Sequence, residues 1–473
     1  MKKIIVLIVI VIILIGGIFI GYTDNRFIFT LKKNIPIELR SFLKKTIFFP
    51  FSHDNKISNL EKENNKLKSK VNDLENQIYL ISKLTSSLED SDKSLPIISE
   101  DNILSESEKS YTLKKYLFTG VTPWQYNLRK PVGYITEYEE NLIFLSGEGD
   151  ITYLAKKDLN EQNLSLNLKY IKNNFKEIVQ TESKIFKKGR ESFRGIMIND
   201  NHIYISYYKM IENGCYNISI LKSRFNFESL KFEDFFSYDE CSKNMSNHSG
   251  GKMVKYNNEK FFFTTGDAQL FINAQKDESF FGKLYLISFK SGNYELVAKG
   301  MRDTQGAFWY KKNSKLFLTE HGPQGGDEIN ILSIDELEKK INFGWPISTY
   351  GELGPTPIKE NKFTSKDENN HTPNGFKEPL FWFKGNSVAP SAIINVDGFK
   401  NDFNSDFFMS AMGNVPAPGR RSLHHFKYDK KNNSLIPNDI IHIGERIRDL
   451  VYLQKEKKIV MILENSPSIA VLY

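Results

Sequence analysis

Asn141-Leu-Ile-Phe-Leu is one of six similar segments that decide the fold of this chain. The other five are Asn201-His-Ile-Tyr-Ile, Glu259-Lys-Phe-Phe-Phe, Ser314-Lys-Leu-Phe-Leu, Ser405-Asp-Phe-Phe-Met and Lys457-Lys-Ile-Val-Met. Their starts lie 60, 58, 55, 91 and 52 residues apart, and most are followed by a turn and a second apolar run. A period near 50 is typical of a four-stranded propeller blade, with the longest gap holding an insertion. We therefore predict an all-β, six-bladed β-propeller over residues 116–473. A pair of β-sandwiches is the alternative, but it would not require such regular spacing.

The composition excludes several classes of protein. The chain has 473 residues, of which 40% are hydrophobic, with 36 Phe and 22 Tyr, so most of it should fold. The net charge of +7 is spread along the chain, and no basic stripe points to nucleic acid as a partner. Only two cysteines occur, which excludes a disulfide-built scaffold and a four-thiolate zinc site. Any metal would be held by oxygen or imidazole.

The N-terminus contains an apolar segment over residues 4–22 that is long enough to cross a bilayer. A cleavable signal peptide begins in the same way, but no clear small-x-small cleavage site follows, so we favour a retained anchor. The basic residues after the span outnumber Lys2 and Lys3 before it: Arg26, Lys32, Lys33 and Arg40. This count alone favours a cytoplasmic body under the positive-inside rule.

A heptad pattern over residues 56–88 predicts a parallel coiled coil and therefore a homodimer. Ile57, Asn64, Val71 and Ile78 occupy the a positions, and the d positions hold Leu60, Leu67, Leu74, Ile81 and Leu88. Asn64 at an a position favours two strands in fixed register. The alternative is a single amphipathic helix packed on its own body. The polar, acidic residues 89–115 that follow are interpreted as a linker.

Four basic side chains share a position relative to the repeats. Arg190, His248, Arg302 and Arg448 lie 11, 11, 12 and 9 residues before the second, third, fourth and sixth repeats. Loops that lead into equivalent strands meet at one mouth of a propeller, so we expect one basic pocket there. Flanking guanidinium groups would disfavour protonation of His248, leaving it able to accept a proton. Arginines in a closed pocket favour carboxylates or a developing oxyanion.

Three other histidines are interpreted as structural: His53, His424 and His425. The loop Glu320-His-Gly-Pro-Gln-Gly-Gly-Asp-Glu-Ile-Asn330 combines glycines, carboxylates and exposed carbonyls. Calcium takes six to eight oxygen ligands, main-chain carbonyls included, and suits such a loop. An ordinary tight turn with solvated acids is the alternative.

This loop, together with Asn342-Phe-Gly-Trp-Pro-Ile-Ser-Thr-Tyr-Gly351, Asn247-His-Ser-Gly-Gly-Lys-Met253 and Gly300-Met-Arg-Asp-Thr-Gln-Gly306, resembles the glucose/sorbosone dehydrogenase family. The resemblance covers residues 128–473. It implies a six-bladed propeller that depends on pyrroloquinoline quinone (PQQ) and Ca²⁺ and oxidises an aldose or related alcohol. It also places the catalytic domain outside the cytoplasmic membrane, against the charge count. There Cys215 and Cys241 could form a disulfide.

The resemblance also implies roles for individual residues. His248 would be the catalytic base and Arg302 the group that stabilises charge on the quinone oxygen. The remaining cofactor-binding positions would be Arg190, Asp303, Gln305, Arg446 and Arg448. The carbonyls of Gly322 and Pro323 would bind the quinone-ligated calcium, and Glu328 with the carbonyl of Phe343 would bind a second one.

Several positions depart from the family pattern. Asp303 stands where the family has an amide, Arg190 stands at a glutamine position, and the lysine of some members falls near Met412. An acid beside an anionic cofactor is unfavourable unless it is compensated. The sequence therefore predicts a membrane-anchored dehydrogenase that transfers electrons to an acceptor at the membrane. A non-catalytic calcium-binding propeller that binds a glycan or a protein partner is the alternative.

Overall fold

The computed structural model describes residues 63–64, 67, 95–117, 133–147, 149–159, 165–166, 168–179, 192–245, 248–351, 371–413, 419–464 and 468–473. The chain divides into two units, Met1–Thr85 and Ser86–Tyr473. In the first unit, Glu63, Asn64 and Leu67 are helical and exposed, while the predicted anchor and most of the predicted coiled coil lie outside the described residues. Among the residues that are described, no helix is both long and apolar enough to cross a membrane.

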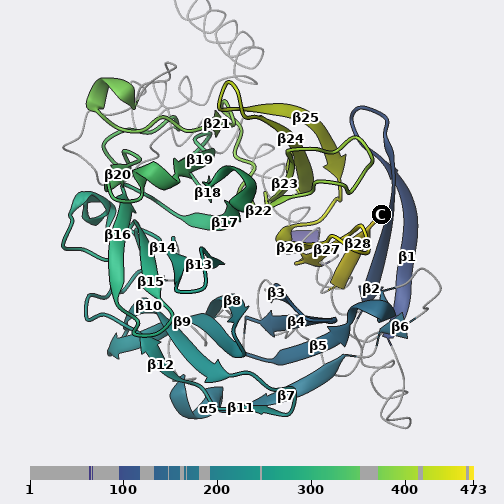
Figure 1. The fold of residues 1–473 in the computed structure, drawn as a ribbon, viewed down its shortest axis with the longest axis horizontal. Coiled ribbons are helices and arrows are strands. Elements are labelled where there is room, and N and C mark those ends of the chain that lie inside the picture. The colour runs from purple at the N-terminus through teal and green to yellow at the C-terminus, as the bar shows by residue number, and fades with distance from the viewer. Residues whose placement is uncertain are drawn as a thin grey trace, which may run out of the picture. The chain divides into compact units, whose positions relative to one another are not determined.

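The second unit is a ring of six β-sheets, which confirms the predicted six-bladed propeller (Figure 1). The first sheet contains β3 (Gly133–Tyr138), β4 (Asn141–Ser146), β5 (Ile151–Ala155), β7 (Lys169–Asn173) and β11 (Ser229–Leu230). The second contains β8 (Phe193–Asn199), β9 (His202–Glu212), β10 (Cys215–Arg224) and β12 (Glu233–Phe236). The third contains β13 (Gly250–Lys255), β14 (Lys260–Thr265), β15 (Lys283–Ser288), β16 (Tyr294–Lys299) and β20 (Ile341–Asn342).

The other three blades complete the ring. The fourth contains β17 (Thr304–Tyr310), β18 (Lys315–Glu320), β19 (Glu328–Ser333) and β21 (Phe381–Trp382). The fifth contains β22 (Pro390–Asn395), β23 (Asp406–Ala411), β24 (Ser422–Asp429) and β25 (Ser434–His442). The sixth contains β26 (Ile447–Leu453), β27 (Lys458–Leu463), β28 (Ser468–Leu472), β2 (Ser110–Leu117), β1 (Leu95–Leu104) and β6 (Ser165–Leu166).

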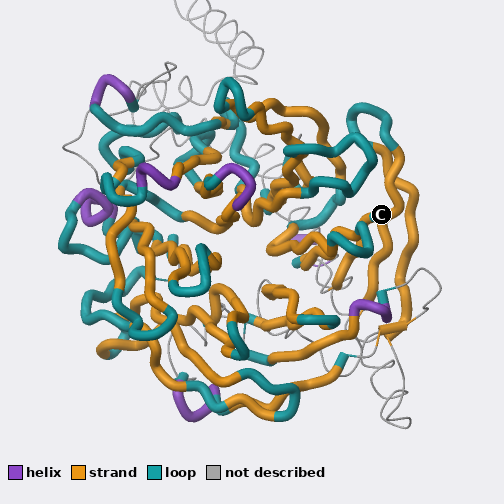
Figure 2. Tube along the Cα trace, viewed as in Figure 1, coloured by secondary structure: helices purple, strands orange, loops and turns teal. Residues whose placement is uncertain are grey.

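Helices in the described part are short and lie between the strands (Figure 2). They are the α-helix α5 (Phe175–Ile178) and the 3₁₀-helices η1 (Lys156–Asp158), η2 (Phe271–Gln275), η3 (Lys311–Asn313), η4 (Ile334–Glu336) and η5 (Thr372–Asn374).

Each of the six sequence repeats forms the second strand of a blade, where both faces of the strand are buried. Phe261 and Phe263 of β14 pack toward the second blade, while Phe262 between them packs toward the fourth. A strand that is buried on both faces reads as a continuous apolar run and not as an alternation. Six apolar clusters of described residues fill the spaces between neighbouring blades in this way.

The predicted linker 89–115 and the predicted domain start at residue 116 are wrong. Strand β2 inserts between β28 and β1, with Leu113 opposite Leu472 and Tyr116 opposite Ile469, and so closes the ring. Residues 89–115 were interpreted as a linker because they are polar and charged. Charged residues are, however, tolerated in the outer strands of a blade. Strand β2 gains a pairing partner from the other end of the chain, and β1 pairs with β2 and β6.

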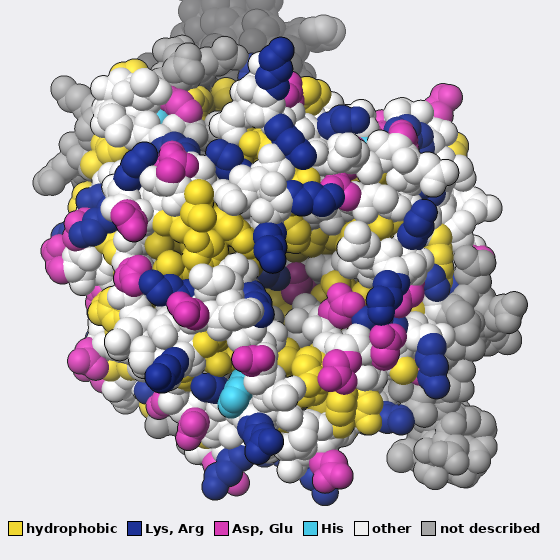
Figure 3. All heavy atoms as spheres, in the orientation of Figure 1, with side chains coloured by type: hydrophobic (Ala, Val, Ile, Leu, Met, Phe, Trp, Pro, Cys, Tyr) yellow, Lys and Arg dark blue, Asp and Glu magenta, His cyan; other side chains and the backbone are white. Residues whose placement is uncertain are grey.

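The inner strands of the blades surround the centre of the ring. Neighbouring inner strands contact one another in the order β3, β8, β13, β17, β22 and β26, and β26 returns to β3. A hollow opens at the centre of the ring, with basic side chains along its border (Figure 3). Loops that lead into these strands are therefore brought together, whatever their separation in the sequence.

Candidate functional site

Side chains near the starts of the inner strands contact one another across blades. The Gln305 side chain of the fourth blade accepts a hydrogen bond from Arg194 Nη2 of the second blade at 2.9 Å. The same oxygen lies 3.4 Å from Arg448 Nη1 of the sixth blade. Asp303 Oδ1 accepts from the Gly250 N–H of the third blade at 3.1 Å. Side chains and backbone from four blades thus lie in contact here, and Arg448 is the member of the predicted basic set that takes part in these contacts.

His248 is held by a carboxylate that sequence reasoning missed. Its Nδ1 lies 2.9 Å from Asp267 Oδ1, and the Asp267 side chain is completely buried. Asp267 also accepts hydrogen bonds from Trp345 Nε1 at 2.7 Å and from the Gln269 N–H at 2.8 Å. A carboxylate at Nδ1 favours the tautomer with the proton on Nδ1, which leaves Nε2 as the acceptor. We expected arginines next to His248, but the side chain at hydrogen-bond distance is an acid that orients the imidazole ring.

Local backbone geometry also holds His248 in place. His248 has a φ of 52°, and its carbonyl accepts the Ala268 N–H at 2.9 Å. A Cβ at Gly266 would lie 1.9 Å from that carbonyl oxygen, so only glycine allows the two segments to approach. The turn that carries Asp267 is thereby fixed against the loop that carries His248.

Arg302 lies against the predicted calcium loop. Its Nη1 donates to the carbonyls of His321 at 2.8 Å and Gly322 at 3.0 Å, and its guanidinium lies 5.4 Å from the centre of the Trp345 ring. Its Nε is buried and has no hydrogen-bond partner among the described residues. Since a buried donor without a partner is costly, this atom points to a ligand that supplies an acceptor.

Asp303 is buried among positive and donor groups. Burial alone would raise the pKa of its carboxyl, but His321, His248, Arg194 and the Gly250 N–H outweigh burial and hold this pKa below its ordinary value. Burial lowers the pKa of the neighbouring His321 to about 4, although Asp303 opposes the shift. Asp303 and His321 are thus coupled: burial disfavours the charged form of each, and the charge of each stabilises that of the other.

Arg194 is a site residue that the sequence analysis did not find, while Arg190 lies outside the described residues. Arg194 is buried, and its Nε also donates to the Gly250 carbonyl at 3.2 Å. It is the second residue of β8, just as Arg448 is the second residue of β26. The equivalent position of Arg194 and Arg448 in their inner strands was thus the signal that could have identified Arg194.

Arg446 and Arg448 share one buried carboxylate. Their Nε atoms donate to the two oxygens of Glu464, at 2.6 and 2.5 Å. Burial would raise the pKa of Glu464, but the two arginines outweigh it and lower this pKa. Arg446 Nη1 also donates to the carbonyl of Met412, and Arg420 packs close to the next residue, Gly413. Glu464 holds the arginine pair in position, and the pair retains one net positive charge.

The loop from Glu320 to Glu328 gathers buried acids. Glu320 and Glu328 lie opposite each other in the β18–β19 pair, and Asp327 accepts the N–H groups of Gly322 at 3.1 Å and Ala389 at 2.7 Å. Burial is the main cause that raises the pKa of Glu320 to about 8 and that of Asp327 to about 7. Burial disfavours the ionised form of these acids, and a bound cation would stabilise it.

A small cavity of about 20 Å³ lies beside these acids, with room for roughly one water molecule or ion. Its lining includes all four of the predicted calcium ligands: Gly322, Pro323, Glu328 and Phe343. A separate cavity of about 580 Å³ is lined by other residues and shares none with the His248 site. His424 and His425 line that larger cavity. Burial lowers the pKa of His424 to about 4, and His425 bonds Asp406 at 2.7 Å, in keeping with structural roles.

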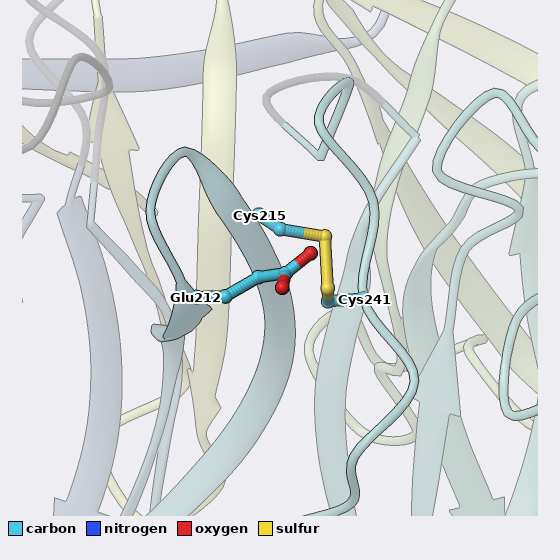
Figure 4. Close-up of side chains that lie close together, drawn as sticks. All are labelled: Glu212, Cys215 and Cys241. Atoms are coloured by element: carbon cyan, nitrogen blue, oxygen red, sulfur yellow. A yellow bond between two sulfur atoms is a disulfide. The ribbon is translucent and has the colours of Figure 1, made fainter.

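A disulfide anchors the segment that leads to His248. Cys215 at the start of β10 is bonded to Cys241, with 5.4 Å between the Cα atoms, and Glu212 lies beside the bond (Figure 4). Ser242 pairs with Tyr216 through two backbone hydrogen bonds of 2.8 and 3.0 Å. The Ser242 hydroxyl also donates to the Ala268 carbonyl, next to Asp267, at 2.9 Å. The crosslink therefore fixes the chain seven residues before the imidazole.

The donors of this site fit an anionic cofactor. Arg302 and Arg420 each have a buried Nε without a hydrogen-bond partner among the described residues, and Arg194, Arg446 and Arg448 lie close by. The acid at Asp303, which departs from the family pattern, is compensated by Arg194 and by backbone and amide donors. Guanidinium groups bind carboxylates well, so a ligand with several carboxylates matches the set.

The fold and the site define a six-bladed propeller with an acid-oriented histidine in an arginine-rich pocket. The family model for glucose/sorbosone dehydrogenase matches residues 165–470, and the chain belongs to this family. The chain is similar to the aldose sugar dehydrogenase YliI of Escherichia coli, with 27% identity over 213 residues. That alignment spans 42% of this chain and 54% of the relative, so it covers only about half of that protein.

Solved structures share the fold. A glucose dehydrogenase crystal structure has a TM-score of 0.58 and 19% identity, covering 74% of this chain and 97% of its own. The PQQ-bound aldose sugar dehydrogenase from Streptomyces coelicolor has a TM-score of 0.51 and 14% identity, covering 80% and 97%. At these identities the likeness establishes the architecture of the propeller.

The disulfide is expected to restrict motion of the loop that carries His248. In a Cys215→Ser/Cys241→Ser variant, amide hydrogen exchange over residues 241–250 should speed up, because low local stability permits opening. Exchange in β24 should not change, and Glu212→Gln, which keeps the disulfide, is the matched control. Equal exchange over 241–250 in the double variant and the unaltered protein would show that the crosslink does not position this loop.

Proposed function

We propose that this protein is a PQQ-dependent dehydrogenase that oxidises an aldose sugar or a related alcohol. The observation that carries the proposal is the His248–Asp267 hydrogen bond, together with a buried Arg302 Nε that has no hydrogen-bond partner among the described residues. Family membership supports it, as does the E. coli relative, which is named as an aldose sugar dehydrogenase. The likeness in fold to a PQQ-bound enzyme is consistent with the cofactor.

The residues of this chain would divide the work as follows. His248 Nε2 accepts the proton of the sugar hydroxyl, and Asp267 keeps the imidazole oriented and stabilises the imidazolium that forms. When bound, the quinone supplies the acceptor for the hydride. Arg302 offers donors to an oxyanion, and such preorganised donors stabilise charge that develops in the transition state.

The same residues would hold the cofactor. Arg446 and Arg448 would bind its carboxylates, and Glu464 holds both side chains through their Nε atoms. Gln305 links Arg194 to Arg448 and would close the inner end of the site. The carbonyls of Gly322 and Pro323 would bind the calcium that contacts the quinone, since calcium accepts main-chain oxygens. Glu328 and the Phe343 carbonyl would hold a second cation.

We further propose that residues 4–22 anchor the chain in the cell membrane as a single span, with the propeller in the periplasm or outside the cell. The disulfide between Cys215 and Cys241 supports an oxidising compartment, where such bonds persist. This placement would bring the site near an electron acceptor in the membrane. The heptads over residues 56–88 would pair two copies as a homodimer.

If residues 56–88 form a parallel coiled coil, substitutions in its seam should change the molecular mass of the assembled protein in solution. A chain that lacks residues 1–22 should stay in solution without detergent and should scatter light as a dimer. Replacing Leu67 and Leu74 by Lys should convert it to a monomer, because unpaired charge in a coiled-coil seam is strongly destabilising. The control replaces Lys66, at a c position away from the seam, by Glu. A dimer that survives the double substitution contradicts the coiled coil, and a reporter fused after Tyr473 that is active only in the cytoplasm contradicts the topology.

The proposed base predicts a separation between binding and chemistry. His248→Asn should still bind the quinone, because the carboxylate contacts are assigned to arginines and calcium. Reduction of bound quinone by an aldose should slow by about 10² to 10⁴-fold, the usual contribution of general-base catalysis. Arg302→Ala should impair both binding and reduction, since it would remove part of the binding site as well as an electrostatic stabiliser. Stopped-flow absorbance measures the reduction, with binding titrated separately.

Two results would count against this assignment. Reduction by His248→Asn at the unaltered rate would show that another group takes the proton. Failure of the unaltered protein to bind quinone at saturating calcium would contradict the dehydrogenase proposal itself.

A further inference from the structure

His371 is a buried imidazole whose outer nitrogen is unused. It lies at the start of η5 and is 1% exposed. Its Nδ1 lies 2.6 Å from Ser348 Oγ, so the ring is oriented by that hydroxyl. Its Nε2 has no hydrogen-bond partner among the described residues and lies 3.5 Å from Glu328 Oε1.

Asn330 has a second atom without a hydrogen-bond partner, on a side chain that also contacts Glu328. Its side chain is 2% exposed, and its Nδ2 donates to Glu328 Oε2 at 3.2 Å, which orients the amide. The opposite atom, Oδ1, is buried without a partner among the described residues. Burying an unsatisfied acceptor costs free energy, and here two such atoms belong to side chains that both contact the Glu328 carboxylate.

A cavity beside the Glu328 and Asn330 side chains has the size for a cation. Glu328, Asn330 and Ser348, the hydrogen-bond partner of His371, line this cavity of about 20 Å³, and Arg302 and Glu320 line it as well. Glu320 faces Glu328 across β18 and β19, but it already accepts hydrogen bonds from residues 302–304. Among the described residues Glu328 contacts neither a lysine nor an arginine side chain, so its carboxylate is available to a cation.

We propose that His371 Nε2, Glu328 and Asn330 Oδ1 are ligands of one structural cation, and that this cation is a borderline divalent ion rather than calcium. With Nδ1–H donating to Ser348, the lone pair of Nε2 is available, and a hydrogen bond at the other ring nitrogen is the usual companion of a metal-bound histidine. Calcium takes oxygen ligands, whereas an imidazole favours ions such as zinc. The proposal deepens the second cation site of the proposed function.

The test uses the whole chain, stripped with a chelator and titrated with Zn²⁺, Mn²⁺ or Ca²⁺ alone. Zn²⁺ should bind with a stoichiometry of one and raise the thermal midpoint at lower concentration than Mn²⁺ or Ca²⁺, which favour oxygen ligands, because a ligand of the native state stabilises it. His371→Gln should weaken Zn²⁺ binding by at least about tenfold, the lower end of the loss seen even for outer-shell partners. His442→Gln, at a histidine that is half exposed, is the matched control.

A direct measurement covers the case in which His371→Gln does not fold. X-ray absorption of the unaltered protein with one bound Zn²⁺ should include scattering from an imidazole ring. Oxygen scattering alone, or a thermal midpoint that responds to Ca²⁺ but not to Zn²⁺, would overturn the proposal. No quinone is added in either experiment, so the result is independent of whether the protein proves to be a dehydrogenase.

Discussion

Every blade of this propeller is apolar on both faces and is therefore stable only between two neighbours. Phe261, Phe262 and Phe263 illustrate the constraint, because consecutive side chains of one strand enter two different clusters. A blade at the edge of an open array would expose an apolar face, so the six blades close into a ring. Strand β2 completes the sixth blade by pairing with β28. Closure then fixes the inner strands around a common centre, where the loops that precede them must meet.

Charge at that centre is balanced pair by pair. Glu464 compensates Arg446 and Arg448, Asp449 pairs with Lys252 at 2.8 Å, and Asp303 lies beside Arg194. Buried charges that are paired and hydrogen-bonded are tolerated, while unpaired ones are strongly unfavourable. Against this background Arg302 Nε and His371 Nε2 stand out, because neither has a hydrogen-bond partner among the described residues. Most polar groups near the centre of the ring form hydrogen bonds or ion pairs with one another, so these two atoms indicate where ligands would bind.

Strands that a local sequence pattern encodes were predicted, whereas contacts between residues far apart in the sequence were missed. The second strand of each blade was recognisable because burial on both faces produces a continuous apolar run. Strand β2 was not, since Lys114 and Lys115 give it a polar appearance and its partner β28 lies at the other end of the chain. His248 and Arg302 were found from their shared position before the repeats. Asp267 was missed because it follows a strand and approaches His248 only when the turn at Gly266 folds back.

The central claim is that the ring assembles a site for an anionic quinone from arginines of different blades. Equilibrium titration of PQQ in the presence of calcium, followed by its absorbance, tests this claim most directly in the unaltered protein and in Arg448→Gln. The account predicts saturable binding of one quinone per chain that weakens in the variant, because a charge-assisted contact to a carboxylate is lost. Absence of saturable binding, or equal affinity in the two proteins, would contradict it.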